Sequence, residues 1–420
     1  MIQEDRTVRT TCPYCGVGCQ LDLSIKDEYI YRVDAPFDAA PNYGMLCVKG
    51  RFGTDYVKHP GRVKTPLIRV NREEGRSAEP VWREATWDEA LDFVAGELLR
   101  IKQQYGSESI GSYASAKATH EDTYVFQKFI RALIGTNNVV HCARLCHAGS
   151  VAGLQLALGS SAMSNSIAEM ENLDVFIITG SNTAETHPVI ANFLKRAVRK
   201  NGAKLIVADP RQVEMVDFSH LWLQQNPGTD VALFQAMAHV VVKEGLYDED
   251  FIAQRTEGFQ EYVESLESFT PQWAEEVTGV PAAKISEAAR LYATADRAAI
   301  YWGMGISQST HGTDNTLSLT NLALMCGHIG KTGTGLNPLR GQNNVQGCSD
   351  SGGLPHVYTG YQAVNIPAVQ EKFESHWGVE LNSEAGLTAT EMIDAVLSGA
   401  VRGMFVVGEN PMLSEPDQDH

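Results

Sequence analysis

Residues 174–211 read DVFIITGSNTAETHPVIANFLKRAVRKNGAKLIVADPR, and this stretch decides the fold class. The apolar run Asp174–Thr179 predicts a buried strand that ends at Gly180, and Lys204–Ala208 predicts a second one. Between them, Pro188–Lys200 predicts a helix. A strand, a helix and a second strand in this order indicate a βαβ unit. We therefore expect a parallel sheet with helices on both faces.

A third buried strand is predicted at Ala298–Trp302, and Gly303 and Gly305 follow it. Each predicted strand of this region ends in glycine or in small polar residues. Ligands of such sheets bind beyond the carboxyl ends of the strands. The sequence therefore favours a nucleotide-like ligand at this edge.

Shorter elements are predicted on both sides of the central region. Residues 1–62 are rich in Cys, Gly and Pro and indicate a small β module built around a metal. A helix is predicted at Trp87–Gln104, with Thr86 and Glu89 as a reciprocal capping box. The remaining predictions are strands Gln20–Ile25, Tyr29–Val33 and Met404–Val407, helix Glu121–Ile134, which stops at Gly135, and helix Ala389–Leu397. We expect a multi-domain α/β protein, in which two αβα domains with largely parallel sheets follow the β module.

The chain has 420 residues and a net charge of −17. This charge argues against binding to nucleic acid, which needs a basic face, and means that an anionic substrate needs a local cationic pocket. No apolar run reaches the ~18 residues of a membrane span, and the N-terminus has neither a signal core nor a twin-arginine pair. We expect a cytoplasmic protein without membrane insertion.

Four cysteines near the N-terminus form the most specific motif. Cys12, Cys15 and Cys19 follow the pattern C-x2-C-x3-C, and Cys47 follows after 27 residues. Four thiolates can hold Zn²⁺ or an iron–sulfur cluster. Zinc sites usually pair two short CxxC hooks, so three cysteines together and one apart favour a 4Fe–4S cluster. The glycines of the CPYCGVGC segment would let backbone N–H groups approach the sulfurs.

Residues 137–147 read NNVVHCARLCH and crowd two cysteines and two histidines together. A thiolate is a soft metal ligand, and a neighbouring cation or metal lowers its pKa. Cys146 could therefore be a ligand or nucleophile, and His147 a proton carrier. The same pair also fits a buried cysteine beside a hydrogen-bonded core histidine, and the spacing alone leaves both interpretations open.

Residues 337–347 read NPLRGQNNVQG and predict a polar loop. Amide side chains without apolar periodicity do not build a core, but they can bind a polar ligand. Arg340 in their midst can hold a carboxylate through two parallel hydrogen bonds. An exposed polar loop without a ligand is the alternative.

These three segments occur in an order that resembles the molybdopterin-guanine-dinucleotide oxidoreductases and, within them, the catalytic (alpha) subunits of formate dehydrogenases. The resemblance covers essentially the whole chain. The series also includes GSN at 180–182, ADPR at 208–211, GTD at 228–230 and GMG at 303–305.

The resemblance implies a molybdenum or tungsten centre that oxidises formate to CO2. The metal would be held by Cys146, by a terminal sulfido and by the four sulfurs of bis(molybdopterin guanine dinucleotide). His147 would help to handle the proton, Arg340 would bind the carboxylate of formate, and Gln342 would position the pterin or the substrate. Lys49, which by its position alone is a surface lysine, would lie between the cluster and one pterin.

Further residues are implied by the resemblance at the strand ends, where they would contact the dinucleotides. They are Asn182, Glu185, Asp209, Arg211, Gly228, Asp230, Gly303, Gly305 and Gln308.

The resemblance also implies a domain division into residues 1–62 for the cluster, 141–342 for a Rossmann-like domain, and 63–140 with 343–420 for a discontinuous domain. Chains of this family usually continue into a C-terminal β-barrel-like domain. We therefore expect either a fragment or a separate chain that supplies this domain. An electron-accepting flavin or iron–sulfur subunit is the other expected partner.

Two other functions are compatible with these motifs. A cytoplasmic nitrate reductase of the same family carries a similar cluster, but such enzymes tend to have Met where this chain has His147. A pterin-free electron-relay subunit would keep the fold and the cluster, but it would have little reason to retain Cys146, His147 and Arg340 together.

Overall fold

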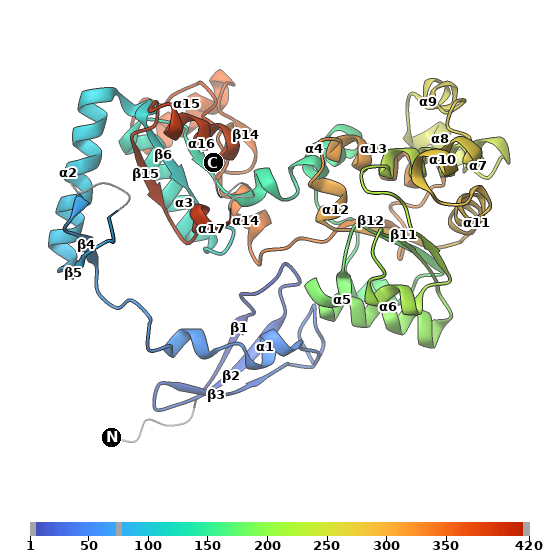
Figure 1. The fold of residues 1–420 in the computed structure, drawn as a ribbon, viewed down its shortest axis with the longest axis horizontal. Coiled ribbons are helices and arrows are strands. Elements are labelled where there is room, and N and C mark those ends of the chain that lie inside the picture. Colours follow the sequence, from blue (N-terminus) through green and yellow to red (C-terminus); the bar gives the residue numbers. More distant parts are fainter. Residues whose placement is uncertain (1–5, 73–77, 415–420) are drawn as a thin grey trace. The chain divides into compact units, whose positions relative to one another are not determined.

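The chain folds into two compact units, each built on its own parallel sheet (Figure 1). The computed structural model describes residues 6–72 and 78–414. Unit 1 takes in Met1–Arg51 and Leu145–Asn343, and unit 2 takes in Phe52–Arg144 and Asn344–His420. The three-part domain division implied by the resemblance stays a prediction.

Unit 1 is centred on a five-stranded parallel sheet with the strand order β10-β9-β8-β11-β12. Its strands are β8 (Val175–Thr179), β9 (Lys204–Ala208), β10 (Leu221–Leu223), β11 (Ala298–Trp302) and β12 (Gly335–Pro338). β8, β9 and β11 confirm the predicted strands. Every residue of β8 and β11 is buried, as expected for a parallel sheet that is covered on both faces.

Helices cover both faces of this sheet. Those on the first face, where Trp302 points, are α4 (Ala148–Leu158), α7 (Asp230–Lys243), α11 (Ala282–Ala293) and α13 (Gly312–Met325). On the second face, where Tyr301 points, lies α6 (Pro188–Asn201), which confirms the predicted helix. Its first residue is proline, whose fixed φ suits the first helical position, and it ends at Gly202 with a left-handed φ of +74°.

A three-stranded antiparallel sheet, in the order β1-β2-β3, forms the N-terminal module of unit 1. β2 (Gln20–Lys26) and β3 (Tyr29–Asp34) confirm two predicted strands. β1 (Arg6–Thr11) is not among the predicted strands, because all of its residues are exposed and RTVRTT has no alternating apolar pattern. Cys12 and Cys19 of the module join the hydrophobic cluster around α6, so the module and the sheet share one core.

Unit 2 contains a second parallel sheet in the order β15-β6-β7. Its main elements are β6 (Ile110–Tyr113), β7 (Val139–Val140), β15 (Gly403–Val406), α2 (Trp87–Tyr105), α3 (His120–Lys128) and α16 (Ala389–Leu397). α3 continues as a π-helix (Phe129–Ile134), and Gly135 ends it with a φ of +85°. The predicted helices and the last predicted strand are thus confirmed, as is the α/β class.

The remaining elements are short and mostly peripheral. They are α1 (Val48–Phe52), α5 (Thr183–Thr186), α8 (Glu249–Arg255), α9 (Phe259–Ser265), α10 (Pro271–Thr278), α12 (Met304–Ser307), α14 (Val345–Asp350), α15 (Pro367–Trp377), α17 (Pro411–Ser414), β4 (Leu67–Arg69), β5 (Trp82–Glu84), β13 (Val357–Tyr358) and β14 (Gln362–Ala363).

One local prediction is corrected by the structure. The segment 337–347 is only partly a loop, because its first residues complete the edge strand β12 and its last residues begin α14. At the start of α2, Thr86 Oγ1 accepts from the Glu89 N–H at 3.2 Å. The Glu89 carboxylate pairs with Arg83 and also interacts with the Thr86 N–H, and both contacts lower its pKa.

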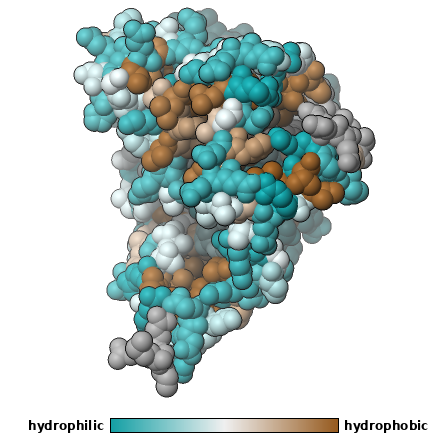
Figure 2. Space-filling model, turned by 90° about the vertical axis from the view of Figure 1, so that its left-hand side faces the viewer, coloured by the Kyte–Doolittle hydropathy of each residue, from teal (hydrophilic) through white to brown (hydrophobic). Residues whose placement is uncertain are grey.

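Helix α2 leaves much of its apolar face unburied within the described residues. Leu98 and Ile101 are buried, whereas Trp87 is 68% and Leu91 60% exposed. Apolar side chains are visible on the side of the molecule where α2 lies (Figure 2). Within the described ranges, none of the helices combines the length and the apolar character that crossing a membrane requires.

Arg131 ties unit 2 together from its interior. The side chain is 1% exposed, and burial lowers its pKa to about 10. Its Nη2 donates to the carbonyl oxygens of Gly352, Leu354 and Val357 at 3.2, 2.6 and 2.9 Å. The guanidinium thus gives donors to three carbonyls of one backbone segment, which makes it a structural residue.

We expect the change Arg131→Met to lower the free energy of unfolding by about 3 kcal/mol, because three buried carbonyls lose their donor. Urea denaturation followed by tryptophan fluorescence measures the change. Arg100→Met is the control, since Arg100 pairs with Glu97 on the exposed side of α2 and should shift the midpoint little. Equal midpoints for the two variants would contradict this role of Arg131.

Candidate active site

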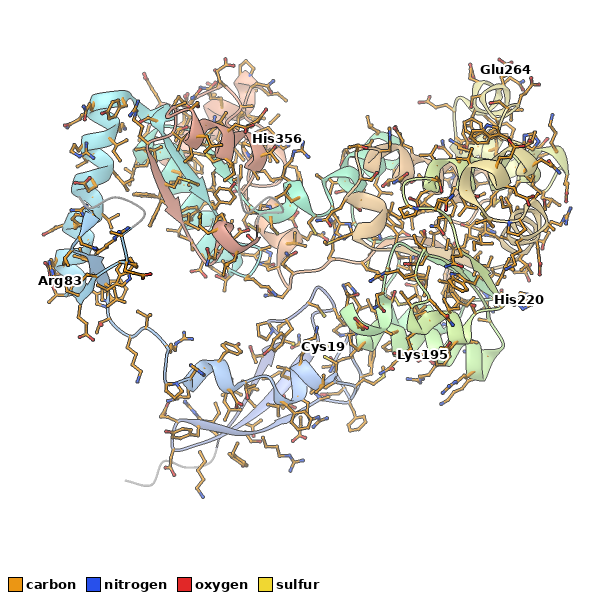
Figure 3. All side chains as sticks on the ribbon, viewed as in Figure 1. Cys19, Arg83, Lys195, His220, Glu264 and His356 are labelled. Carbon is orange, nitrogen blue, oxygen red and sulfur yellow. The ribbon has the colours of Figure 1, made fainter. Side chains whose placement is uncertain are left out.

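The N-terminal cysteines line one pocket of unit 1, beside the first residues of α6 (Cys19 is labelled in Figure 3). Burial, together with the nearby thiols of Cys15, Cys12 and Cys47, raises the pKa of the Cys19 thiol to about 12. None of the eight cysteines, all of which lie in the described ranges, forms a disulfide. Four close thiols, of which Cys12 and Cys19 are buried and Cys15 and Cys47 partly buried, fit the donor set of an iron–sulfur cluster, whose irons would offset the repulsion between the thiolates.

A site for a single metal ion, in contrast to a cluster, is not found among the described residues. In the described part of the chain, no three His, Cys, Asp or Glu side chains are arranged as ligands of one metal ion.

The loop that carries Arg340 is held from both sides by histidines. His147 Nε2 donates to the carbonyl oxygen of Leu339 at 2.9 Å, and His187 Nε2 donates to that of Arg340 at 2.6 Å. Arg340 Nη2 donates to the carbonyl oxygen of Ser161 at 2.6 Å. The backbone and the guanidinium of Arg340 are therefore both fixed by contacts within unit 1.

The cysteine segment reaches the same loop. The Gly16 N–H donates to the carbonyl oxygen of Gly341 at 3.0 Å. A Cβ at Gly16 would lie 2.5 Å from the Arg340 oxygen and 2.7 Å from its Cβ, so this approach requires glycine. The N–H of Gly16 thus binds the Arg340 loop.

Cys146 lies beside this loop and is 4% exposed. Its Sγ is 3.5 Å from Met304 Sδ and 3.9 Å from Gln342 Oε1. Burial raises the pKa of the thiol, whereas the charge of Arg340 and two backbone N–H groups lower it. The structure thus brings Cys146, Arg340 and Gln342 together, and their chemical roles stay predictions.

His147 ends a buried chain of hydrogen bonds. Trp302 Nε1 donates to Ser150 Oγ at 2.7 Å, Ser150 and Ser307 hydroxyls lie 2.5 Å apart, and Ser307 Oγ is 3.0 Å from His147 Nδ1. Because Nε2 must donate to the Leu339 carbonyl, Nδ1 accepts from Ser307. Burial lowers the pKa of His147 to about 4, so the ring is neutral at pH 7. Both ring nitrogens are engaged, so the ring holds the loop in this arrangement, and its proton-handling role stays a prediction.

Lys49 lies near His187. Burial and, to a smaller extent, the charge of Lys49 lower the pKa of His187, which holds the Arg340 carbonyl. Lys49 is exposed, as a surface lysine would be. It is nevertheless close to His187, which lies between the cysteine pocket and Arg340.

Unpaired polar atoms gather at or just beyond the ends of the parallel strands. Thr179 Oγ1, Asn182 Oδ1, Gln225 Oε1 and both amide atoms of Asn337 are buried without a hydrogen-bond partner among the described residues. Buried polar groups are normally hydrogen-bonded. The carboxyl edge of the sheet therefore fits a polar ligand such as a pterin dinucleotide.

The packing of the protein itself requires glycine at positions 303 and 305. A Cβ on Gly303 would lie 2.7 Å from the Gly180 oxygen, and one on Gly305 would lie 2.7 Å from the Gly180 Cα. The two glycines therefore let the ends of β8 and β11 touch. Their predicted contact with a dinucleotide stays a prediction.

The acidic candidates are held by their own loops. Asp209 is buried, and its Oδ1 accepts from the Arg211 N–H at 2.9 Å. Asp230 Oδ1 accepts from Gln225 Nε2 at 3.1 Å, and burial, with a smaller effect of Asp209, raises its pKa. The two carboxyls thus share one region after β9 and β10.

The remaining candidates are exposed. Arg211, Glu185 and Gly228 lie on the surface of unit 1, and the Gln308 amide donates to the carbonyl oxygen of Leu145. Gln308 therefore holds the residue that precedes Cys146. Its predicted approach to a dinucleotide stays a prediction.

Three residues that the sequence analysis does not assign to the site belong to it by geometry: His187, Met304 and Ser307. Met304 lies between Gly303 and Gly305, which are themselves predicted site residues. His187 precedes Pro188, and a histidine at a helix start has no distinctive local pattern. Only its distance to the Arg340 carbonyl reveals it.

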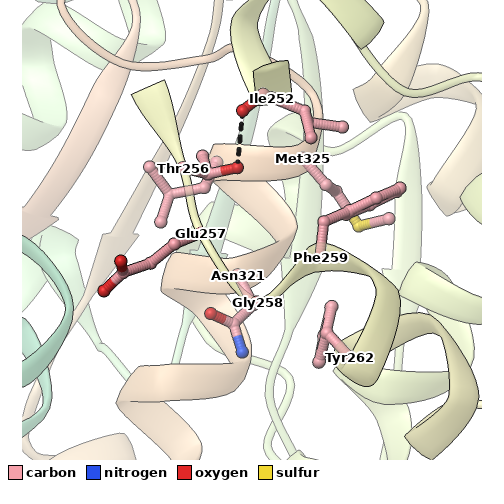
Figure 4. Close-up of a pocket in the computed structure, with 9 residues that line it drawn as sticks. Ile252, Thr256, Glu257, Gly258, Phe259, Tyr262, Asn321 and Met325 are labelled. Atoms are coloured by element: carbon pink, nitrogen blue, oxygen red, sulfur yellow. Dashed lines mark hydrogen bonds between the residues drawn. The ribbon is translucent and has the colours of Figure 1, made fainter. Parts of the chain in front are cut away.

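Another hollow lies between α8, α9 and α13 (Figure 4). Polar groups that line it bond within the protein: Thr256 Oγ1 donates to the Ile252 carbonyl at 2.9 Å, and Tyr262 OH donates to Gln235 at 2.6 Å. We assign this hollow no part in the site.

Comparison with known proteins gives two matching family models. The model described as molybdopterin oxidoreductase matches residues 62–420, and the one described as molybdopterin oxidoreductase Fe4S4 domain matches residues 5–59. Among solved structures, acetylene hydratase from Pelobacter acetylenicus is similar in fold, with a TM-score of 0.78 and 23% identity. The match covers 98% of this chain and 58% of that one.

Curated relatives are more similar in sequence. F420-dependent formate dehydrogenase 1 subunit alpha of Methanococcus maripaludis is 47% identical over 98% of this chain and 59% of its own length. Formate dehydrogenase H of Escherichia coli is 44% identical over 98% of this chain and 57% of its own length. The chain therefore spans less than two thirds of these relatives.

We expect the change Cys47→Ala to abolish cluster binding, because the pocket loses one of four thiolate ligands. Iron and acid-labile sulfide should fall from about four per chain to near zero. Cys326→Ala is the control, since Cys326 is buried at the end of α13 and should leave the iron content unchanged. A full iron complement in Cys47→Ala would contradict the ligand set.

Proposed function

Because this chain belongs to the molybdopterin oxidoreductase family, we propose that it is the catalytic subunit of a formate dehydrogenase, or a large part of it. It would oxidise formate to CO2 and pass two electrons to a partner protein. The observation that carries the proposal is the buried Cys146 thiol in the field of Arg340. A metal ligand and an anion-binding cation side by side fit the oxidation of a small carboxylate.

The donor sets on this chain fit both groups that the family implies. Cys12, Cys15, Cys19 and Cys47 would hold the 4Fe–4S cluster, and Cys146 would be the protein ligand of molybdenum or tungsten. The unpaired polar atoms at the strand ends would bind the guanine dinucleotides of the two pterins. When bound, the pterin-held metal supplies the redox chemistry, which no side chain of the chain can perform.

Arg340 would orient the substrate. A guanidinium offers two parallel N–H donors to a carboxylate and remains charged at any physiological pH. This local cation offsets the repulsion of formate by the acidic chain, whose net charge is −17. Gln342, whose amide lies 3.9 Å from the Cys146 sulfur, would then limit how formate can turn.

Formation of the metal–thiolate bond requires that Cys146 loses its proton. Arg340 and the N–H groups of Gly341 and His147 favour the thiolate, which offsets part of the cost of burial. We propose that the neutral His147 contributes by holding the loop that carries Arg340. Proton handling would be a further role of His147, and it requires that the ring releases one of its two hydrogen bonds.

The electron-accepting partner, a flavin or iron–sulfur subunit, is part of this proposal, as is the cytoplasmic location. The formate dehydrogenase names of the relatives support formate over nitrate as the substrate. Metal analysis separates the enzyme from a pterin-free relay protein, which would contain iron without molybdenum or tungsten.

We expect Arg340→Ala to lower kcat/KM for formate about 100-fold and Arg340→Lys about tenfold, because lysine keeps the charge without the paired donors. Formate-dependent viologen reduction by the holoenzyme measures both variants. Arg297→Ala is the control, since Arg297 pairs with Asp174 at the opposite end of the sheet. An unchanged kcat/KM in Arg340→Ala would exclude this substrate role.

A further inference from the structure

We propose that His187 is a positioning residue that sets Arg340 for carboxylate binding and links it to the cysteine pocket. This inference rests on the proposed function. His187 is 4% exposed and donates through Nε2 to the carbonyl oxygen of Arg340 itself. The other contacts to the loop backbone reach the flanking residues Leu339 and Gly341.

The contact is chemically specific. A carbonyl oxygen can only accept, so Nε2 carries the proton of the neutral ring, and Nδ1 faces the Thr186 hydroxyl at 2.8 Å. The Nε2–oxygen distance of 2.6 Å is short for such a bond. Because the site is buried, loss of the imidazole would remove this hydrogen bond from the Arg340 carbonyl and loosen the backbone at that residue.

The position of the Arg340 backbone matters for catalysis. The Arg340 side chain is held at its guanidinium end by the Ser161 carbonyl, and the backbone of the same residue is held by the His187 bond. A displacement of a few tenths of an ångström at the backbone is transmitted along the side chain. Substrate-binding groups need placement of about 0.5 Å to be productive.

The link to the cysteine pocket follows from the two residues after His187. Pro188 and Val189 line the pocket together with the four cysteines. Pro188 is the first residue of α6, and its ring fixes the backbone there. Three consecutive residues therefore contact the Arg340 carbonyl on one side and the cysteine pocket on the other, with the Lys49 charge close to the imidazole.

Substitutions at position 187 test the proposal, because two amides mimic different ring nitrogens. Glutamine can place an N–H near the position of Nε2, whereas asparagine reaches only as far as Nδ1. We expect His187→Ala and His187→Asn to raise KM for formate about tenfold with kcat changed less than about threefold, and His187→Gln to stay within about threefold of the parent in both.

The matched control is His328→Ala. His328 is also buried and donates through Nε2 to a backbone carbonyl, that of Tyr292, at 2.9 Å. Its loss removes the same kind of bond elsewhere in unit 1. We expect a lower melting temperature with an unchanged KM, which separates positioning of Arg340 from general destabilisation.

A second measurement does not depend on activity. The Gly16 N–H donates to Gly341, so amide hydrogen exchange in the peptide that contains Gly16 reports whether the loop has moved. In holoenzyme, we expect faster exchange in this peptide for His187→Ala than for His328→Ala. Equal exchange in the two variants, or an unchanged KM in His187→Ala, would overturn the proposal. If the parent holoenzyme does not oxidise formate, the proposed function fails, and the exchange comparison still decides whether His187 holds the loop.

Discussion

The parallel pairing of β11 with β8 on one side and β12 on the other is the constraint on which the site depends. Parallel strands place all their carboxyl ends at one edge of the sheet. The segments that leave β8, β11 and β12 therefore emerge side by side. These exits carry His187, Met304 and Arg340, and the contact between His187 and Arg340 needs no long loop.

A directed chain of buried hydrogen bonds connects this sheet to the Arg340 loop. It runs from Trp302 at the end of β11 through Ser150 and Ser307 to His147 and the Leu339 carbonyl. Each hydroxyl accepts one bond and donates the next, and such chains strengthen each member. The residue next to the candidate metal ligand is thus anchored in the core of the sheet.

Electrostatics at the site runs against the charge of the whole chain. The chain is acidic, with a net charge of −17, yet the groups around Cys146 are a guanidinium, backbone N–H groups and neutral histidines. Burial opposes the thiolate of Cys146 and the charged form of His147 alike. A bound cationic metal would reverse this balance for the thiolate, which explains why a buried cysteine suits a ligand role.

Local sequence patterns predict the elements β8, β9, β11 and α6 and the four thiols of the N-terminal module. They do not predict β1 and the edge strand β12, because β1 is exposed and β12 ends in proline, so neither has the apolar run of a buried strand. Which distant groups meet depends on tertiary folding. His187 and Arg340 are 153 residues apart, and no local pattern encodes which carbonyl a donor will reach once the parallel sheet has brought the strand ends together.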